Sequence, residues 1–455
     1  MSPAGLAGPM ASGPGTSLPG MERAPVRVGL LGCGHVGGSL ARLLSTDASR
    51  ISARTGLQLE LAAVAVRSLA RERPVSFPDG VVTTDARAVV ADGSIQVIVE
   101  VMGGIEPARS LILEALKSGK PVVTANKELL ANCGAELFEA AAVAGVDLLF
   151  EASVAGAIPL IRPLRESLAG ERIIRVMGIV NGTTNFILSR MTDSSASYHD
   201  SLAEAQGLGY AERDPTADVE GFDAAAKAAI LANVAFGVRV VAGDVYREGI
   251  DAITPDDIAV ARRMGYVIKL LAIVEQDDLG GAPSVAVRVH PAMVPENHPL
   301  ASVRDSFNAV FVQGEALGDL MLLGRGAGGM PTASAVLGDL LDAAHNLSVG
   351  GAGRTVALRQ APLRPIDDLT SAYYLSLMVA DRPGVLHAVA GVLGRHCVSV
   401  RSMEQEASDD DSAGPARLVF VTHPALERDV QDCLRELRHL DVVDRIGGLI
   451  RVIGQ

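Results

Sequence analysis

The chain has 455 residues, more than one ordinary hydrophobic core accommodates, so two or three domains are expected. Its 48% hydrophobic and 20% charged residues are typical of a soluble globular protein. The net charge of -13 argues against a nucleic-acid partner, and no apolar run reaches the roughly 20 residues of a membrane helix. Scattered cysteines and the lack of a secretory signal favour the cytoplasm.

The N-terminal part of the chain predicts a nucleotide-binding domain. Residues 1–24 are rich in Gly, Pro and Ser and are expected to be a disordered tail. A buried-strand pattern at 26–31 then leads into a G-x-G-x-x-G turn at Gly32, Gly34 and Gly37, followed by a helical pattern. Such a turn between strand and helix lets backbone N–H groups approach a pyrophosphate, which indicates a dinucleotide site.

The second predicted strand, 59–67, ends in a basic residue. An NAD site usually carries an acid at this position for the ribose hydroxyl. Here Arg67, Arg71 and Arg73 follow instead, which favours the 2′-phosphate of NADP. NAD remains possible, and the alternative is a solvated basic loop.

Two charged residues further along the chain are candidates for the site. Lys127 closely follows a predicted strand at 121–124, at the edge where open α/β sheets bind ligands, although surface lysines are also common there. Glu151 stands alone in the apolar stretch 148–159 and needs a partner. A helix N-terminus, a metal ion or a basic side chain would each serve.

An acidic segment from Glu212 leads into an Ala-rich helical run that ends near 232. Asp223 and Lys227 stand four apart and share one helix face. This pair can hold a zwitterionic amino acid or move a proton, or it can be a solvated ion pair. Before it, a strand–turn–helix pattern at 176–188 offers Thr183 or Thr184 as the helix cap.

The remaining sequence predicts a helix at 257–275 and short strands between 284 and 324. A second glycine-rich turn at 324–332 leads into another helix. After a Gly-rich linker, the order strand, helix, strand, strand, helix, strand from about residue 370 indicates a separate βαββαβ module.

With these elements in place, the chain resembles the homoserine dehydrogenases that carry a C-terminal ACT regulatory domain. The resemblance rests on TANK, EASVAGAIP, GIVNGTTNFIL, GYAERDPTADVEGFDAAAK and GRGAGGMPTASAV, which begin at residues 124, 151, 178, 209 and 324. It implies an α/β chain with a Rossmann-type NAD(P)-binding domain, an α+β substrate-binding and dimerisation domain, and a ferredoxin-like ACT domain. The expected boundaries are 25–155 with a return segment near 325–345, then 156–324, a linker at 346–369, and 370–455.

This family interconverts L-aspartate 4-semialdehyde and L-homoserine with NAD(P), on the route to threonine, methionine and isoleucine. By resemblance, Lys127 and Lys227 are the catalytic lysines, with Lys227 as proton donor and acceptor. The implied substrate-binding residues are Gly209, Glu212 and Asp223. The implied cofactor-binding residues are Gly32, Gly34, His35, Val36, Gly37, Arg67, Thr124, Lys127 and Gly328. His35 departs from the family pattern, in which threonine is common at this position.

The resemblance also implies a monovalent cation, sodium or potassium. Its ligands would be Glu151 and the backbone oxygens of Val154, Gly156 and Ile158. Threonine is the expected effector of the ACT domain, at the turn formed by Asp381, Arg382, Pro383, Gly384, Val385 and Leu386. A homodimer or homotetramer is expected, and the alternative is an ACT domain that only dimerises.

Two other functions fit parts of the sequence. An aldehyde-oxidising dehydrogenase shares the nucleotide fold but needs an activated cysteine, and only Cys133 stands near the expected cleft. A non-catalytic amino-acid sensor would retain the fold without the chemistry. The presence of Lys127 together with the Asp223–Lys227 pair argues against the sensor.

Overall fold

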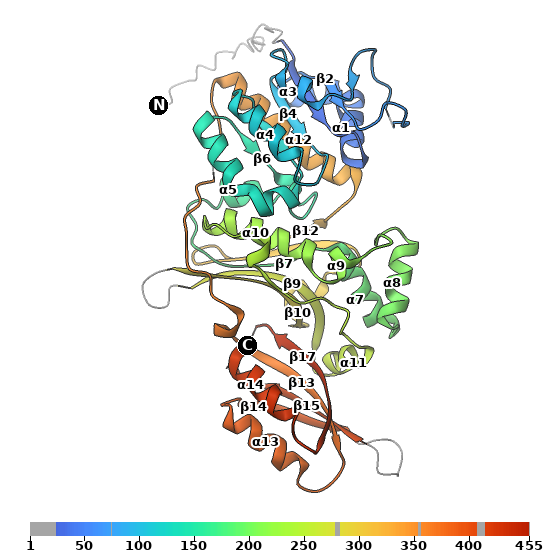
Figure 1. Ribbon diagram of the computed structural model, residues 1–455, viewed down its shortest axis with the longest axis vertical. Coiled ribbons are helices and arrows are strands. Elements are labelled where there is room, and N and C mark those ends of the chain that lie inside the picture. The colour runs from blue at the N-terminus through green and yellow to red at the C-terminus, as the bar shows by residue number, and fades with distance from the viewer. Residues whose placement is uncertain (1–23, 74, 278–282, 354–355, 407–414, 455) are drawn as a thin grey trace, which may run out of the picture.

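The computed structural model describes residues 24–73, 75–277, 283–353, 356–406 and 415–454 (Figure 1). The nucleotide-binding domain, a central sheet domain and a C-terminal domain follow one another along the longest axis. The α/β class and this arrangement confirm the predicted fold. The predicted disordered tail, apart from residue 24, lies outside the described residues.

The N-terminal sheet is parallel, with strand order β3-β2-β1-β4-β5-β6. Its strands read as short runs of Val, Ile, Leu and Ala because helices cover both faces. The strands are β1 (Val26–Leu31), β2 (Leu59–Ala65), β3 (Val82–Thr83), β4 (Val97–Glu100), β5 (Val122–Thr124) and β6 (Leu148–Leu149).

Two sets of helices cover this sheet. One face packs against α1 (His35–Thr46), α2 (Ala48–Thr55) and α12 (Gly329–Val349). The other packs against α3 (Ala86–Ala91), α4 (Ala108–Lys117) and α5 (Lys127–Ala144). The chain therefore returns through α12 to complete the nucleotide-binding domain after it has built the central one.

The central domain is a mixed sheet, antiparallel except where β8 pairs with β10, with helices on one face (Figure 1). Its Ala-rich helix α10 lies between α5 and the strands, and its small side chains belong to the core that both share. The strands are β7 (Ile173–Ile179), β8 (Tyr246–Arg247), β9 (Tyr266–Asp277), β10 (Ser284–Pro295), β11 (Phe307–Gly314) and β12 (Gly318–Arg325). The helices are α6 (Ile161–Arg165), α7 (Gly182–Ser194), α8 (Tyr198–Gly207), α9 (Thr216–Val219), α10 (Phe222–Phe236) and α11 (Pro255–Arg263).

The predicted helix at 257–275 is wrong for most of its length. Only α11 is helical, with a capping box formed by Thr254 and Asp257, and the chain turns at Gly265, where φ is 79°. Strand β9 follows, hydrogen-bonded on both sides, to β7 and β10. A strand buried on both faces shows no alternation, so its continuous apolar run resembled a buried helix.

The C-terminal domain has the predicted βαββαβ order and a helix-covered sheet. Its elements are β13 (Thr370–Ala380), α13 (Val385–Arg395), β14 (Val400–Glu406), β15 (Pro415–Thr422), β16 (Ala425–Leu426), α14 (Glu427–Leu437) and β17 (Val443–Val452). Strand β17 pairs in parallel with β10, with Ala292 opposite Arg451. One continuous sheet thus runs through the central and C-terminal domains, in the order β12-β11-β7-β9-β10-β17-β13-β15-β14.

Candidate active site

Asp223 is the centre of the site, because it binds two lysines that come from different domains. Gly221 has a φ of 82° and ends the preceding turn, so that α10 starts at Phe222 and Asp223 lies in its first turn. One turn later, Lys227 donates to Asp223 Oδ2 at 2.6 Å and to the Val180 carbonyl at 2.6 Å. The ammonium group of Lys127 pairs with Asp223 Oδ1.

The two lysines differ in exposure. The Lys227 side chain is 10% exposed and that of Asp223 is 6% exposed, so a solvated helix ion pair is excluded. The Lys127 side chain is 47% exposed and stands at the start of α5, just past the carboxyl end of β5. Lys127 therefore faces the open side of the cluster and Lys227 the buried side.

The electrostatics of the cluster follow from this asymmetry. Burial alone would raise the pKa of Asp223, but the two ammonium groups hold that pKa well below its usual range. Burial lowers the pKa of Lys227 and the charge of Lys127 adds to the effect, although Asp223 opposes both. For Lys127, Asp223 outweighs burial and the pKa is raised. The pKa values of the two lysines are thus shifted in opposite directions.

Asn181 and Asp218 complete the cluster, and sequence reasoning missed both. The Asn181 amide donates to Asp218 Oδ1 at 2.7 Å and to Asp223 Oδ2 at 2.9 Å. Its carbonyl oxygen accepts from the Thr184 backbone N–H, so Asn181 is the cap of α7. The predicted threonine cap is therefore wrong. The signal was present in Asn181-Gly182-Thr183-Thr184, because Asn is a preferred cap residue.

The predicted substrate residues Gly209 and Glu212 lie in the loop between α8 and α9. Gly209 has a φ of 77°, and the next carbonyl, that of Tyr210, accepts from Thr183 Oγ1 at 2.7 Å. This bond ties the loop to the beginning of α7. Within the described residues the Glu212 carboxylate makes no hydrogen bond or ion pair and is open to solvent. The structure thus brings Asp223 to the lysines, whereas the Glu212 carboxylate has no partner in the described part of the chain.

In the first glycine turn, one side packs closely against backbone and the other side is open to a ligand. A Cβ on Gly37 would lie 2.1 Å from the Gly32 carbonyl oxygen, and Gly32 itself has a φ of 99°. A Cβ on Gly34 would meet nothing within 4 Å. Gly34 is the N-cap of α1, which has no side-chain cap and no acid in its first turn. The helix N-terminus is therefore open to a pyrophosphate.

The second glycine turn, at 324–332, lies against the first one. Gly328 has a φ of 119° and caps α12, and a Cβ on Gly329 would lie 2.9 Å from the His35 carbonyl oxygen. His35, the first residue of α1, is exposed, and Val36 beside it is half-buried. The N-termini of α1 and α12 are thus adjacent at the carboxyl edge of the sheet.

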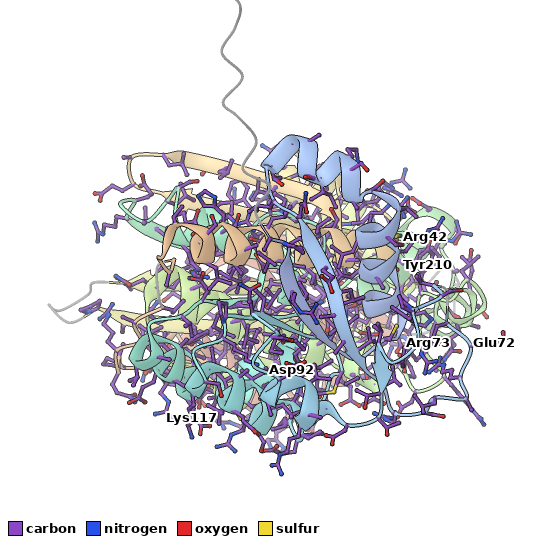
Figure 2. All side chains as sticks on the ribbon, turned by 90° about the horizontal axis from the view of Figure 1, so that it is seen from above. Arg42, Glu72, Arg73, Asp92, Lys117 and Tyr210 are labelled. Carbon is purple, nitrogen blue, oxygen red and sulfur yellow. The ribbon has the colours of Figure 1, made fainter. Side chains whose placement is uncertain are left out.

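The basic loop after β2 borders this turn. Arg67 is exposed just beyond the strand, whereas Arg73 folds back and donates to the Ser68 and Leu69 carbonyls. In Figure 2, Arg73 and Glu72 lie at one side of the nucleotide-binding domain. Burial raises the pKa of the Cys33 thiol in the glycine turn, while the nearby Arg73 charge opposes the rise. The loop therefore lies close to the first glycine turn.

Thr124, a predicted cofactor residue, is fully buried and belongs to a hydrogen-bonded group that sequence reasoning did not find. Its hydroxyl donates to Glu100 Oε2 at 2.6 Å and accepts from the Asn126 N–H. Glu100 also accepts from the backbone N–H groups of Met102 and Gly103. Its pKa is raised by burial, which these bonds oppose. Glu100 thus joins the ends of β4 and β5 directly before Lys127.

Glu151 finds its partner at a helix N-terminus, one of the three options that the sequence left open. Its carboxylate accepts from the backbone N–H groups of Leu160, Ile161 and Arg162 at 2.5–2.8 Å, at the start of α6. Ala155 and Gly156 between them both have a φ of 57°. Within the described part of the chain, no group of three or more His, Cys, Asp or Glu side chains is arranged to hold a metal ion.

The predicted effector turn lies at the start of α13. Gly384 has a φ of 91° and forms the N-cap, and Val385 is buried. The other residues of the turn, Asp381, Arg382, Pro383 and Leu386, are exposed.

A parallel nucleotide-binding sheet and a lysine–carboxylate–lysine cluster at its ligand-binding edge define an NAD(P)-dependent oxidoreductase. Family models agree: residues 32–151 match the homoserine dehydrogenase NAD-binding domain, residues 159–341 match homoserine dehydrogenase, and residues 373–439 match the ACT domain. The chain belongs to the homoserine dehydrogenase family. The expected family and enzyme class are thereby confirmed.

Individual relatives give the same result. The homoserine dehydrogenase of Mycobacterium tuberculosis is 50% identical over 441 residues, which are 96% of this chain and 99% of the relative. That of Corynebacterium glutamicum is 50% identical, with 94% and 95% covered. A crystal structure of the Thiobacillus denitrificans homoserine dehydrogenase superposes with a TM-score of 0.86 at 40% identity, covering 94% of this chain and 98% of that one.

A solved structure of a hyperthermophilic archaeal homoserine dehydrogenase in complex with NADPH is also similar. Its TM-score is 0.60 at 27% identity, with 73% of this chain and all of that one covered. The aldehyde-oxidising and sensor alternatives are therefore wrong. None of the helices in the described ranges is long and apolar enough to cross a membrane.

Proposed function

We propose that this homoserine dehydrogenase reduces L-aspartate 4-semialdehyde at the Lys127–Asp223–Lys227 cluster, with NADPH as the preferred cofactor. The single observation that carries the proposal is the shared carboxylate of Asp223, which fixes two lysines side by side; burial lowers the pKa of Lys227, whereas that of Lys127 is raised. NADPH supplies the hydride. Its phosphates would lie at the open N-terminus of α1, beside Gly32, Gly34, His35, Val36 and Gly37.

The two lysines divide the remaining work. Negative charge develops on the aldehyde oxygen as the hydride arrives, and a cation directed at that oxygen stabilises the transition state. Lys127, which is more exposed and has a raised pKa, supplies this cation. Lys227, whose pKa is lowered, delivers the proton and takes it back when homoserine is oxidised.

The carboxylates hold the amino acid. Glu212 has no partner of its own among the described residues, so its charge is available for the substrate ammonium group. Gly209 gives this loop its turn, and Thr183 ties the loop to the site. Asp223 holds both lysines in place and also helps to bind the ammonium group of the substrate. Gly328 and Thr124 would close the nicotinamide side.

The finer regulatory proposals rest on the family. Threonine would bind at the turn from Asp381 to Leu386 in a dimer or tetramer of cytoplasmic subunits. A sodium or potassium ion would be held by backbone oxygens of Val154, Gly156 and Ile158. Glu151, the fourth expected ligand, accepts hydrogen bonds from the start of α6 and so stabilises the same loop. The left-handed residues Ala155 and Gly156 turn this loop sharply, which is compatible with carbonyl ligands.

A steady-state assay of nicotinamide absorbance tests the proposal. The wild-type chain should oxidise L-homoserine with NADP and, less efficiently, with NAD. Asp223→Asn should lower kcat far more than it weakens NADP binding, because both lysines lose their common anion. An Asp223→Asn variant with unchanged kcat would remove the cluster from the mechanism. Threonine added in parallel tests the proposed effector.

A further inference from the structure

Arg451 is a buried cation of the C-terminal domain. It lies on β17, the strand that pairs with β10 of the central domain. Its side chain is 2% exposed, on β17 opposite Ala292 of β10. The guanidinium forms two 2.8 Å hydrogen bonds to the Glu427 carboxylate, which also accepts from the Tyr373 hydroxyl at 2.8 Å. These contacts lie within the C-terminal domain and fix the direction of the arginine.

The same guanidinium crosses the domain boundary. It donates to Glu248 Oε1 at 2.8 Å and to the Tyr246 hydroxyl at 3.3 Å. Burial alone would lower the pKa of Arg451, but the two carboxylates hold it raised, so the group stays charged. Glu248 belongs to the central domain, in the segment 246–250 that includes β8. Arg451 therefore anchors this segment from the other domain.

Segment 246–250 in turn supports the chain that leads to Asp223. The Ile250 N–H donates to the Val219 carbonyl at 2.9 Å. A Cβ added to Gly249 would lie 2.5 Å from that carbonyl oxygen, so the two backbones are in direct contact. A change in the position of the segment must therefore move Val219, which ends α9.

The contact continues to the start of α10. A Cβ on Gly221 would lie 3.3 Å from the Glu248 carbonyl oxygen, and the Arg247 guanidinium stacks 3.5 Å from the Phe222 ring centre. Phe222 is the first residue of α10 and precedes Asp223. The segment that Arg451 holds thus packs against both residues that place Asp223.

We propose that Arg451 is a positioning residue of the active site, supplied by the C-terminal domain. Through Glu248 it holds segment 246–250 against the α9–α10 turn and so fixes Asp223 relative to Lys127. The C-terminal domain then completes the substrate side of the active site in addition to any regulatory role. This inference rests on the proposed role of the Asp223 cluster.

The test compares two ways of removing the contact with a matched control. Arg451→Met removes the cation, and Glu248→Gln weakens the boundary contact while Arg451 keeps Glu427. The control is Arg417→Met, because Arg417 also comes from the C-terminal domain and contacts Tyr374 and Asp257, the latter in α11, at 3.1 and 3.4 Å. Initial rates with homoserine and NADP give kcat and both KM values. Thermal unfolding shows which variants fold.

Arg451→Met and Glu248→Gln should lower kcat/KM for homoserine by about ten- to a hundredfold while KM for NADP stays within about twofold. The double variant should be no worse than Arg451→Met, and Arg451→Lys should recover part of the loss. If Arg451→Met does not fold, Glu248→Gln alone decides. An active Glu248→Gln with wild-type constants, or an equal loss in Arg417→Met, overturns the inference. A wild-type chain with no homoserine activity would instead overturn the proposed function.

Discussion

Lys127 and Lys227 bind opposite oxygens of one carboxylate, with side chains 47% and 10% exposed respectively. Two ammonium groups this close would repel each other without Asp223 between them. The shared anion offsets this repulsion, but burial and the Lys127 charge still lower the pKa of Lys227, whereas that of Lys127 is raised. The difference in exposure is thus the physical basis for giving them different chemical roles.

Replacing the buried lysine should affect chemistry rather than cofactor binding. Lys227→Ala should lower kcat by about a hundred- to ten-thousandfold, because the proposed proton donor is lost, and leave NADPH affinity nearly unchanged. Stopped-flow turnover and a titration of NADPH fluorescence measure the two quantities. Lys117→Ala is the control, since Lys117 lies exposed on α4 (Figure 2). Equal losses of turnover and NADPH affinity would contradict the catalytic role.

The basic loop after β2 makes a prediction about cofactor choice. Arg67→Ala should raise KM for NADPH by about tenfold and leave KM for NADH nearly constant, because only NADPH carries a 2′-phosphate. Arg54→Ala, at the end of α2, should change neither constant. If both cofactors respond alike, Arg67 does not contact the phosphate.

The sequence predicts those parts of the site that depend on local spacing. The i,i+4 relation of Asp223 and Lys227 placed them on one helix face, and the glycine turn after β1 marked the nucleotide end. The sequence could not show that Lys127 meets a carboxylate 96 residues away. That contact depends on how α10 packs between α5 and the central sheet, which is tertiary information.

Other features could not be predicted from the sequence, for different physical reasons. Asn181 looked like an ordinary turn residue because its second role, donating to Asp218 and Asp223, is made by contacts distant in sequence. Glu100 ended a strand pattern without any motif around it. The union of the central and C-terminal sheets through β10 and β17 leaves no local signal, since each strand has the composition of any buried strand.

Glu100 should be needed to hold together the ends of β4 and β5 directly before Lys127. Glu100→Gln replaces an acceptor of the Thr124 hydroxyl by an amide donor and should reduce stability by about 1–3 kcal/mol, with a lower kcat/KM for NADPH. Thr124→Ser, which keeps the hydroxyl, should retain most activity. Urea unfolding and initial rates provide the measurements. A Glu100→Gln variant as stable and active as wild type would show that the bond is dispensable.

A substitution of Glu151 can distinguish a structural role of its carboxylate from a role in cation binding. Glu151→Gln keeps one acceptor oxygen but turns an amide group toward a backbone N–H of α6, so we expect a loss of about 1–2 kcal/mol in unfolding free energy. If the proposed cation is held by backbone oxygens, the activation by NaCl relative to choline chloride should persist in the variant. Loss of this activation in a folded variant would make the carboxylate a direct ligand.

A buried lysine outside the site gives a prediction about pH. Lys269 on β9 donates to Asn185 Oδ1 at 3.0 Å, and burial, with help from Arg304, lowers its pKa to about 8 from 10.5. The unfolded chain therefore binds more protons than the folded one between these values, so the stability contributed by this group rises with pH across that window. Relative to Lys269→Met, the wild type should gain up to about 3 kcal/mol between pH 7 and pH 10.5. Urea unfolding of both proteins across this range measures the difference, with Lys117→Met as the exposed control. A difference that stays constant with pH would show that the pKa of Lys269 is not lowered in the folded protein.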